Sequence, residues 1–185
     1  MENLKPNPAN SSPLTPLGFL ERAAVVYADF PSVVYNDTSY IWSETHWRCL
    51  SVASSIVASL RIKRGDVVSF VAPNVPAMYE LHFAVPMAGA ILNNINTRLD
   101  PRTVSVMLRH SESKLVFVDQ LCRNLVLDAL SFFPPNNRTL TPIPILVLIA
   151  ESDDNIDDQH ITIASFAVTR IWWRKKIPGF GGSDR

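Results

Sequence analysis

The sequence predicts an α/β protein with a mostly parallel sheet, on the basis of three observations. Short apolar runs rich in β-branched residues occur at 67–72, 91–95, 114–119 and 144–150. Such runs are typical of strands that are buried on both faces. Longer segments with helical spacing of apolar residues separate the runs, and proline-containing start signals precede several of these segments. Strands that alternate with helices in this way indicate a parallel sheet covered by helices.

Two helices are predicted in the first 60 residues. Thr15 can cap a helix that begins at Pro16, because its hydroxyl can accept a free backbone N–H of the first turn. This helix extends to about Asp29. Ser43 can cap a second helix that reaches about residue 60, and its predicted core-facing side follows helical spacing. That face consists of Trp47, Leu50, Ser54, Val57 and Leu60.

A hairpin and a proline-interrupted helix are predicted next along the chain. The segments 32–36 and 39–42 flank an Asn-Asp turn signal, which favours an antiparallel hairpin. Asn74 is placed to cap a helix over 75–90. Pro86 lies inside this helix and cannot donate a backbone hydrogen bond, so we expect a kink there.

Two shorter helices are predicted at 102–110 and 120–133. Asp100 and Pro101 supply a cap and a first-turn proline for the earlier of the two. Arg98 is expected to form a local ion pair with Asp100, of the small energy that exposed pairs contribute.

The composition is that of one globular domain with a balanced charge. The 185 residues are 47% hydrophobic and 18% charged, and 17 basic side chains offset 17 acidic ones, which gives no electrostatic reason to expect nucleic acid. Cys49 and Cys122 are far apart, as expected for small core residues in a reducing compartment. Residues 1–13 lack the basic start and apolar core of a secretory signal, and the apolar stretch 75–92 is too interrupted for a membrane span.

The histidines and asparagines are the polar candidates for a binding site. The four histidines show no metal-ligand spacing, and they are His46, His82, His110 and His160. We predict that His82 is a packing residue and that His110 lies in the last turn of its helix, where a cation suits the helix dipole. Three asparagines lie near the end of the predicted strand 91–95 or just after it, at the edge where α/β proteins often bind ligands. A polar turn that satisfies its own backbone is the preferred interpretation for Asn93, Asn94 and Asn96.

The carboxy-terminal segment 168–185 differs in composition from the residues before it. The cluster Trp172–Lys176 could bind nucleic acid or a membrane surface. The glycine-rich run Gly179–Ser183 lacks the following lysine and helix of a phosphate-binding loop. A flexible tail is the preferred interpretation of both. The predicted organisation is thus a flexible arm at 1–13, an α/β domain at 14–167 and a disordered tail at 168–185.

Two stretches carry a resemblance to a known family. They are GDVVSFVAPNVPAMYELHFAVPMAGAILNNINTRLDPR, at 65–102, and TPLGFLERAAVVYADFPSVVYND, at 15–37. Both resemble the N-terminal region of adenylate-forming acyl-CoA synthetases, and in particular the plant acyl-activating enzymes that handle short or aromatic carboxylic acids. The resemblance extends from Leu14 to Ile163. It implies a partial N-terminal α/β subdomain of a synthetase of the AMP-dependent type.

The resemblance also implies a reaction for the parent family. A carboxylate attacks the α-phosphate of ATP, and CoA thiol then displaces AMP from the acyl-adenylate, with Mg²⁺ and lysine stabilising the phosphates. The family's Ser/Thr/Gly-rich loop ending in Pro-Lys-Gly, its Tyr-Gly-x-Thr-Glu-like block and its C-terminal lysine are not found in this sequence. No catalytic, cofactor-binding or metal-binding residue is therefore assigned, and no cofactor is expected in this chain.

The resulting hypothesis is a truncated acyl-CoA synthetase that is inactive by itself. Two alternatives remain: a standalone flavodoxin-like binding module that retains a flavin or nucleotide, and an interaction protein that pairs with full-length relatives. Full-length relatives are often peroxisomal and belong to fatty acid metabolism. This chain ends Ser183-Asp184-Arg185, unlike the Ser-Lys-Leu-type address, so a cytoplasmic location is expected.

Overall fold

A four-stranded parallel sheet organises the computed structural model, which describes residues 14–134 and 143–149. Its strands are β3 (Val67–Val71), β4 (Ile91–Asn94), β5 (Leu115–Asp119) and β6 (Ile145–Ile149). They lie in the order β4-β3-β5-β6, and every neighbouring pair is parallel. The predicted α/β fold is confirmed, and each strand begins at its predicted start or one residue later. The predicted arm 1–13 and tail 168–185 lie outside the described residues, as does His160.

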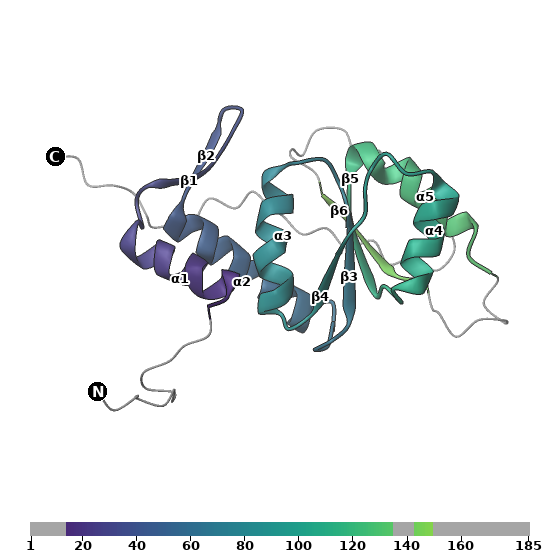
Figure 1. Cartoon of the computed structure of the whole chain (residues 1–185), viewed down its shortest axis with the longest axis horizontal. Coiled ribbons are helices and arrows are strands. Elements are labelled where there is room, and N and C mark those ends of the chain that lie inside the picture. Colours follow the sequence, from purple (N-terminus) through teal and green to yellow (C-terminus); the bar gives the residue numbers. More distant parts are fainter. Residues whose placement is uncertain (1–13, 135–142, 150–185) are drawn as a thin grey trace, which may run out of the picture.

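Helices cover both faces of this sheet and create two separate cores (Figure 1). On one side lie α1 (Pro16–Val26), α2 (Trp42–Ala58) and α3 (Pro76–Met87), and on the other lie α4 (Pro101–His110) and α5 (Arg123–Ser131). Successive side chains of a strand point to opposite faces, and β6 shows the result. Its Val147 and Ile149 join the core under α2 and α3, whereas Leu146 and Leu148 join the core under α4 and α5.

The predicted capping of two helices is confirmed, because in each case a side-chain oxygen accepts a backbone N–H of the first turn. The Thr15 hydroxyl accepts the Gly18 N–H at 3.1 Å, directly before α1. Asp100 accepts the Thr103 N–H at 3.1 Å, and Pro101 is the first residue of α4. The hairpin is also confirmed: β1 (Pro31–Tyr35) and β2 (Thr38–Ile41) pair antiparallel across a two-residue turn.

Two predicted helix caps are wrong. Ser43 donates its hydroxyl hydrogen to the Ala28 carbonyl at 3.0 Å and lies within α2, because β2 continues directly into the helix. The first turn of α2 is closed instead by Glu44, which accepts the Ile41 N–H at 3.2 Å. Asn74 does not cap α3, because Pro76 forces the residue before it into an extended conformation. Val75 has φ −115° and ψ 162°, and it therefore precedes the helix without a side-chain cap.

The predicted core-facing side of α2 is also wrong. Trp47, Leu50, Ser54 and Val57 are exposed, and Leu60 is buried but lies beyond the end of the helix. The buried face consists of Thr45, Cys49, Val52, Ala53 and Ile56. Both faces of α2 carry apolar residues at helical spacing, so periodicity alone cannot choose between them. The face with the smaller side chains packs inward, which allows α2 to lie close to α3.

Several helix ends are earlier than predicted. α1 ends at Val26, and α3 ends at Met87, two residues before Gly89, whose φ of +76° is left-handed and incompatible with a continuing helix. Pro86 lies inside the last turn of α3, and the predicted kink stays a prediction. The predicted helix 120–133 is divided into a 3₁₀ turn, Gln120–Cys122, and α5.

Candidate functional site

The carboxyl edge of the sheet between β3 and β5 is where this topology places a binding site. The chain passes from β3 to β4 on one side and then crosses to β5 on the other. Open α/β sheets bind ligands in the crevice at such a reversal, outside the carboxyl ends of the strands. In this chain the corresponding position lies between the segment after β3, which contains Asn74, and the segment after β5, which begins with Gln120.

Asp119, the last residue of β5, is engaged in local structure. Asp119 is 8% exposed, and its Oδ1 accepts the Leu121 N–H at 2.9 Å, so the carboxylate caps the 3₁₀ turn. The connection from β3 to α3 contains no glycine. A close approach of backbone amides to a pyrophosphate depends on glycines at this connection. Among the described residues, the segments that follow β3 and β5 therefore lack the glycines of nucleotide-binding α/β proteins.

Asn93 belongs to a partly buried polar network and not to a turn. Its Nδ2 donates to Ser69 Oγ at 2.9 Å and to Ser111 Oγ at 3.3 Å. The Ser113 hydroxyl shares hydrogen bonds with Ser69 and Ser111. The network joins β3, β4 and the segment between α4 and β5. The predicted turn is thus wrong for Asn93, because the residue lies inside β4.

The other two asparagines have different surroundings. Asn96 forms the predicted polar turn, since its Oδ1 accepts the Arg98 N–H at 2.9 Å. Asn94 ends β4, and its Nδ2 lies 2.8 Å from His82 Nε2. The predicted ion pair between Arg98 and Asp100 is wrong, because Asp100 accepts hydrogen bonds from the backbone and hydroxyl of Thr103.

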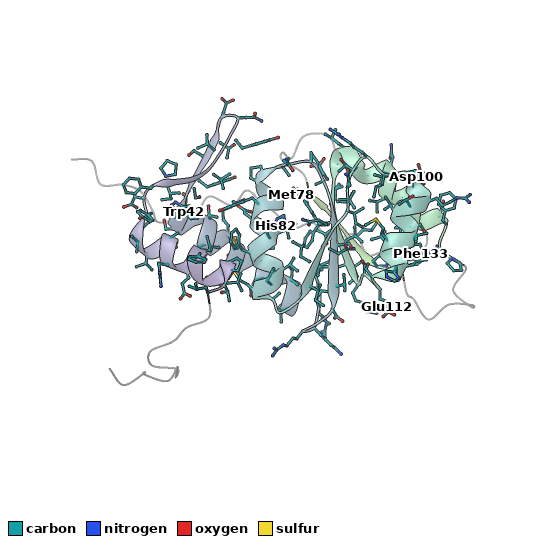
Figure 2. All side chains as sticks on the ribbon, viewed as in Figure 1. Trp42, Met78, His82, Asp100, Glu112 and Phe133 are labelled. Atoms are coloured by element: carbon teal, nitrogen blue, oxygen red, sulfur yellow. The ribbon has the colours of Figure 1, made fainter. Side chains whose placement is uncertain are left out.

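His82 is exposed, so its predicted packing role is wrong. Figure 2 shows His82 beside Met78 on α3, and His82 Nδ1 lies 2.8 Å from the Met78 carbonyl oxygen. Because the Asn94 amide nitrogen can only donate, Nε2 accepts from it and the Nδ1–H donates to Met78. His110 is the last residue of α4, as predicted.

A buried ion pair between α2 and α3 was not predicted from the sequence. Arg48 Nε donates to Glu80 Oε1 at 2.5 Å, and Arg48 Nη2 donates to Oε2 at 3.2 Å. The Glu80 side chain is 0% exposed and that of Arg48 is 12% exposed. The Arg48 guanidinium also lies over the Tyr40 ring, 4.3 Å from its centroid. Glu80 is the one acidic residue of α3, a helix that is mostly apolar, and this isolated charge could have indicated a buried partner.

The two cysteines are buried and free, as predicted. Burial, together with the nearby Glu80 carboxylate, raises the pKa of the Cys49 thiol from 9.0 to about 12. Burial also raises the pKa of Cys122, with the Asp119 carboxylate as a second cause. Thiols with raised pKa values carry little thiolate at neutral pH and react poorly as nucleophiles. Both therefore serve packing.

The described residues contain neither a cluster of metal ligands nor a helix that could span a membrane. Within 14–134 and 143–149, no three His, Cys, Asp or Glu side chains are grouped so that they could hold a metal ion. No helix in the same residues has the length and apolar character to cross a membrane.

The sequence matches a known family over most of its length. The model of the family described as AMP-binding enzyme matches residues 20–166. "Probable CoA ligase CCL11" of Humulus lupulus is 69% identical over 163 residues, which cover 88% of this chain and 28% of the relative. "2-methylpropanoate–CoA ligase CCL4" of the same plant is 64% identical over 155 residues, covering 84% and 27%. "Probable acyl-activating enzyme 5, peroxisomal" of Arabidopsis thaliana is 57% identical over 162 residues, covering 87% and 28%.

Solved structures support the same fold. An anthranilate CoA ligase, AuaEII, in complex with anthranoyl-AMP superposes with a TM-score of 0.64 at 20% identity, covering 72% of this chain and 24% of that one. A benzoate CoA ligase from Burkholderia xenovorans LB400 gives a TM-score of 0.64 at 19% identity, covering 72% and 25%. The fold is that of the adenylate-forming enzymes.

The chain belongs to the AMP-binding enzyme family, and its relatives are plant CoA ligases and acyl-activating enzymes. It spans just over a quarter of the length of the relatives it matches, for example 28% of the CoA ligase CCL11 of Humulus lupulus. The resemblance found in the sequence is thus confirmed at the level of the family.

Proposed function

We propose that this chain supplies the amino-terminal α/β scaffold of an ATP-dependent acid–CoA ligase, and that these 185 residues do not catalyse the ligation by themselves. The observation that carries the proposal is the 69% identity to a CoA ligase of which the chain covers only 28%. The substrate class is a short-chain or aromatic carboxylic acid. One relative's name specifies 2-methylpropanoate, which belongs to that class.

The described residues support the absence of catalysis. Adenylation requires stabilisation of the α-phosphate by backbone amides and cations as negative charge develops on it. The segment between β3 and α3 has no glycine, and the nearby Asp119 carboxylate is acidic and already hydrogen-bonded. Arg48, the arginine buried between α2 and α3, is paired with Glu80. In a complete ligase, the sheet and helices of this part therefore serve as a structural scaffold and do not contribute catalytic groups.

Pyrophosphate release tests the proposal. The purified chain is incubated with ATP, Mg²⁺ and CoA, and with 2-methylpropanoate, butanoate or benzoate in turn. The 2-methylpropanoate–CoA ligase CCL4 of Humulus lupulus serves as the positive control. We expect no release above the blank and no heat of binding when ATP·Mg²⁺ is titrated into the chain. Turnover that co-elutes with the chain through a further column would overturn the proposal.

A further inference from the structure

The connection between α2 and β3 presents three basic side chains to solvent at the amino edge of the sheet. Arg61, Lys63 and Arg64 are all exposed. They lie within four consecutive residues, shortly before β3 begins, so they belong to one continuous surface. Ile62, between the first two, is 5% exposed and belongs to the core under α2 and α3. The connection is therefore anchored through Ile62 while its three cations face outward.

Hydrogen bonds hold this connection in one conformation. The Asp66 N–H donates to the Lys63 carbonyl at 3.0 Å, and the Lys63 N–H donates to Asp66 Oδ2 at 2.8 Å. The Gly65 N–H donates to the Gly89 carbonyl at 2.9 Å, which fixes the turn to the segment before β4. The stem of Arg64 lies over Gly89, because a Cβ at that glycine would be 3.5 Å from Arg64 Cγ. The turn therefore presents its cations from a preorganised backbone.

Arg61 has a backbone conformation that favours glycine. Its φ is +55°, in the left-handed region. The Ile62 N–H donates to the Ile56 carbonyl at 3.1 Å, which is the closure of a helix end where glycine usually takes the position of Arg61. A residue with a Cβ is strained there. Strain that a glycine would relieve is a reason to look for a function of the side chain, and this side chain is an exposed cation.

The neighbouring connections add one apolar side chain and little negative charge. Ile91, the first residue of β4, is 55% exposed, and its N–H donates to the Asp66 carbonyl at 2.9 Å, so it lies beside the turn. Glu112 is exposed in the connection from α4 to β5, at the same end of the sheet (Figure 2), and Lys114 offsets its charge two residues later. Among the described residues, no carboxylate forms an ion pair with any of the three cations.

We propose that the amino edge of the sheet, through these three cations and Ile91, binds a lipid surface that carries anionic headgroups. Clustered lysine and arginine side chains are attracted to such a surface by its charge. An apolar side chain beside them can enter the boundary between headgroups and acyl chains. The inference does not depend on the proposed function, because the amino edge is the opposite end of the strands from the carboxyl edge described above.

Two other anionic partners fit less well. A free phosphate is bound by backbone N–H groups that converge on it, and those of Lys63, Gly65 and Asp66 all donate within the structure. An acidic protein needs an interface of about 800 Å² per partner, and a short turn with one neighbouring side chain is too small for that. A lipid surface requires only that the cations come within about 10 Å of it, the Debye length at about 0.1 M salt.

Co-sedimentation with vesicles tests the proposal. The full chain is mixed with vesicles of phosphatidylcholine, or of phosphatidylcholine with about one third phosphatidylserine. We expect binding to the mixed vesicles alone, and its loss at about 1 M salt, where the Debye length is about 3 Å. The triple variant Arg61→Gly, Lys63→Gln, Arg64→Gln should bind about 100-fold more weakly, at about fivefold per cation. Glycine suits the backbone of residue 61, so this variant keeps its fold. Absence of binding to the mixed vesicles would overturn the proposal.

A matched control removes the same charge elsewhere. Arg22→Gln, Arg98→Gln and Arg102→Gln together remove three exposed cations from α1, from the connection after β4 and from α4. This variant should bind the mixed vesicles less than about threefold more weakly than the parent, because its cations lie away from the turn. Equal losses in the two triple variants would show attraction to net charge alone and would refute the assigned site.

A second control concerns the basic cluster Trp172–Lys176, which could also bind a membrane surface. Lys175→Gln with Lys176→Gln should leave most of the binding in place. If this double variant abolishes binding and the triple variant of the turn does not, the proposal is wrong.

Two further measurements separate lipid from the other anions. Inorganic phosphate at matched ionic strength should not release the protein from the mixed vesicles, and release would indicate a site for free phosphate. Beads coated with polyglutamate should retain the chain less well than the mixed vesicles do, and stronger retention would indicate an acidic protein. Either of these contrary results would overturn the proposal.

Discussion

The ion pair between Arg48 and Glu80 should be the most sensitive single contact of this fold. Glu80 is fully buried and receives two hydrogen bonds from a guanidinium that is itself 12% exposed. Arg48→Ala would leave a buried carboxylate without its cation. Removal of one partner of a buried pair costs about 3–5 kcal/mol. Loss of the contact with the Tyr40 ring adds about 0.5–1 kcal/mol. Since domains are stable by about 5–15 kcal/mol, this variant should be near the limit of folding.

Urea denaturation followed by circular dichroism measures this effect. With a denaturant slope of about 2 kcal/mol/M, a loss of about 4 kcal/mol moves the midpoint down by about 2 M. The double variant Arg48→Met with Glu80→Leu removes both charges and keeps similar volume, so its stability should lie within about 1–2 kcal/mol of the parent. The two singles and the double form a cycle that isolates the interaction.

Arg22→Ala is the matched control, because Arg22 is exposed on α1 and no ion pair is found for it among the described residues. It should change the midpoint by very little. If Arg48→Ala costs no more than about 1 kcal/mol, the pair behaves as a surface salt bridge does, and the reasoning from burial is refuted.

Further results are expected for three other residues, Cys49, Asp100 and Asn93. Because burial raises the pKa of the Cys49 thiol to about 12, a thiol reagent at pH 8 should label the native protein only as fast as it unfolds; immediate labelling of the folded chain would contradict this. The unfolded chain releases the same proton near 9.0, so the free energy of unfolding should fall as the pH rises from about 9 to about 12, and Cys49→Ala should flatten that decline. The hydrogen bonds from Thr103 lower the pKa of Asp100, so its stabilisation of α4 is present above the unfolded-state pKa and is lost as the pH falls through the lower folded value. Asp100→Ala should speed amide hydrogen exchange in the first turn of α4 at neutral pH, whereas Asp100→Asn should not, and equal exchange in both variants would refute the capping role. Asn93→Leu removes the amide that donates to the Ser69 and Ser111 hydroxyls and should cost about 1–3 kcal/mol in urea denaturation; a smaller loss than that of Asn96→Ala would show that the network is not stabilising.

Features with a local physical cause were predicted from the sequence. The strands begin where runs of β-branched residues begin, because such side chains suit an extended, buried backbone. Thr15 and Asp100 cap their helices because the acceptor and its N–H are only three residues apart. The parallel arrangement follows from the alternation of strands with helices. A crossover helix returns the chain to the end of the sheet at which the previous strand began, so the next strand runs in the same direction. The family was also evident from the sequence, because its scaffold stretches occur here in unbroken form.

The tertiary structure decided everything that depends on a distant partner. The sequence of α2 carries two apolar faces, and contact with α3 selected the one that contains Cys49 and Ala53. The Arg48–Glu80 ion pair joins residues 32 positions apart in the sequence, and Asn93 donates a hydrogen bond to Ser69, 24 positions away. Spacing along one element contains no information about which neighbour will lie against it. The free energy of burying a charge or an amide depends on that neighbour, and so only the folded arrangement of α2, α3 and the sheet determines these roles.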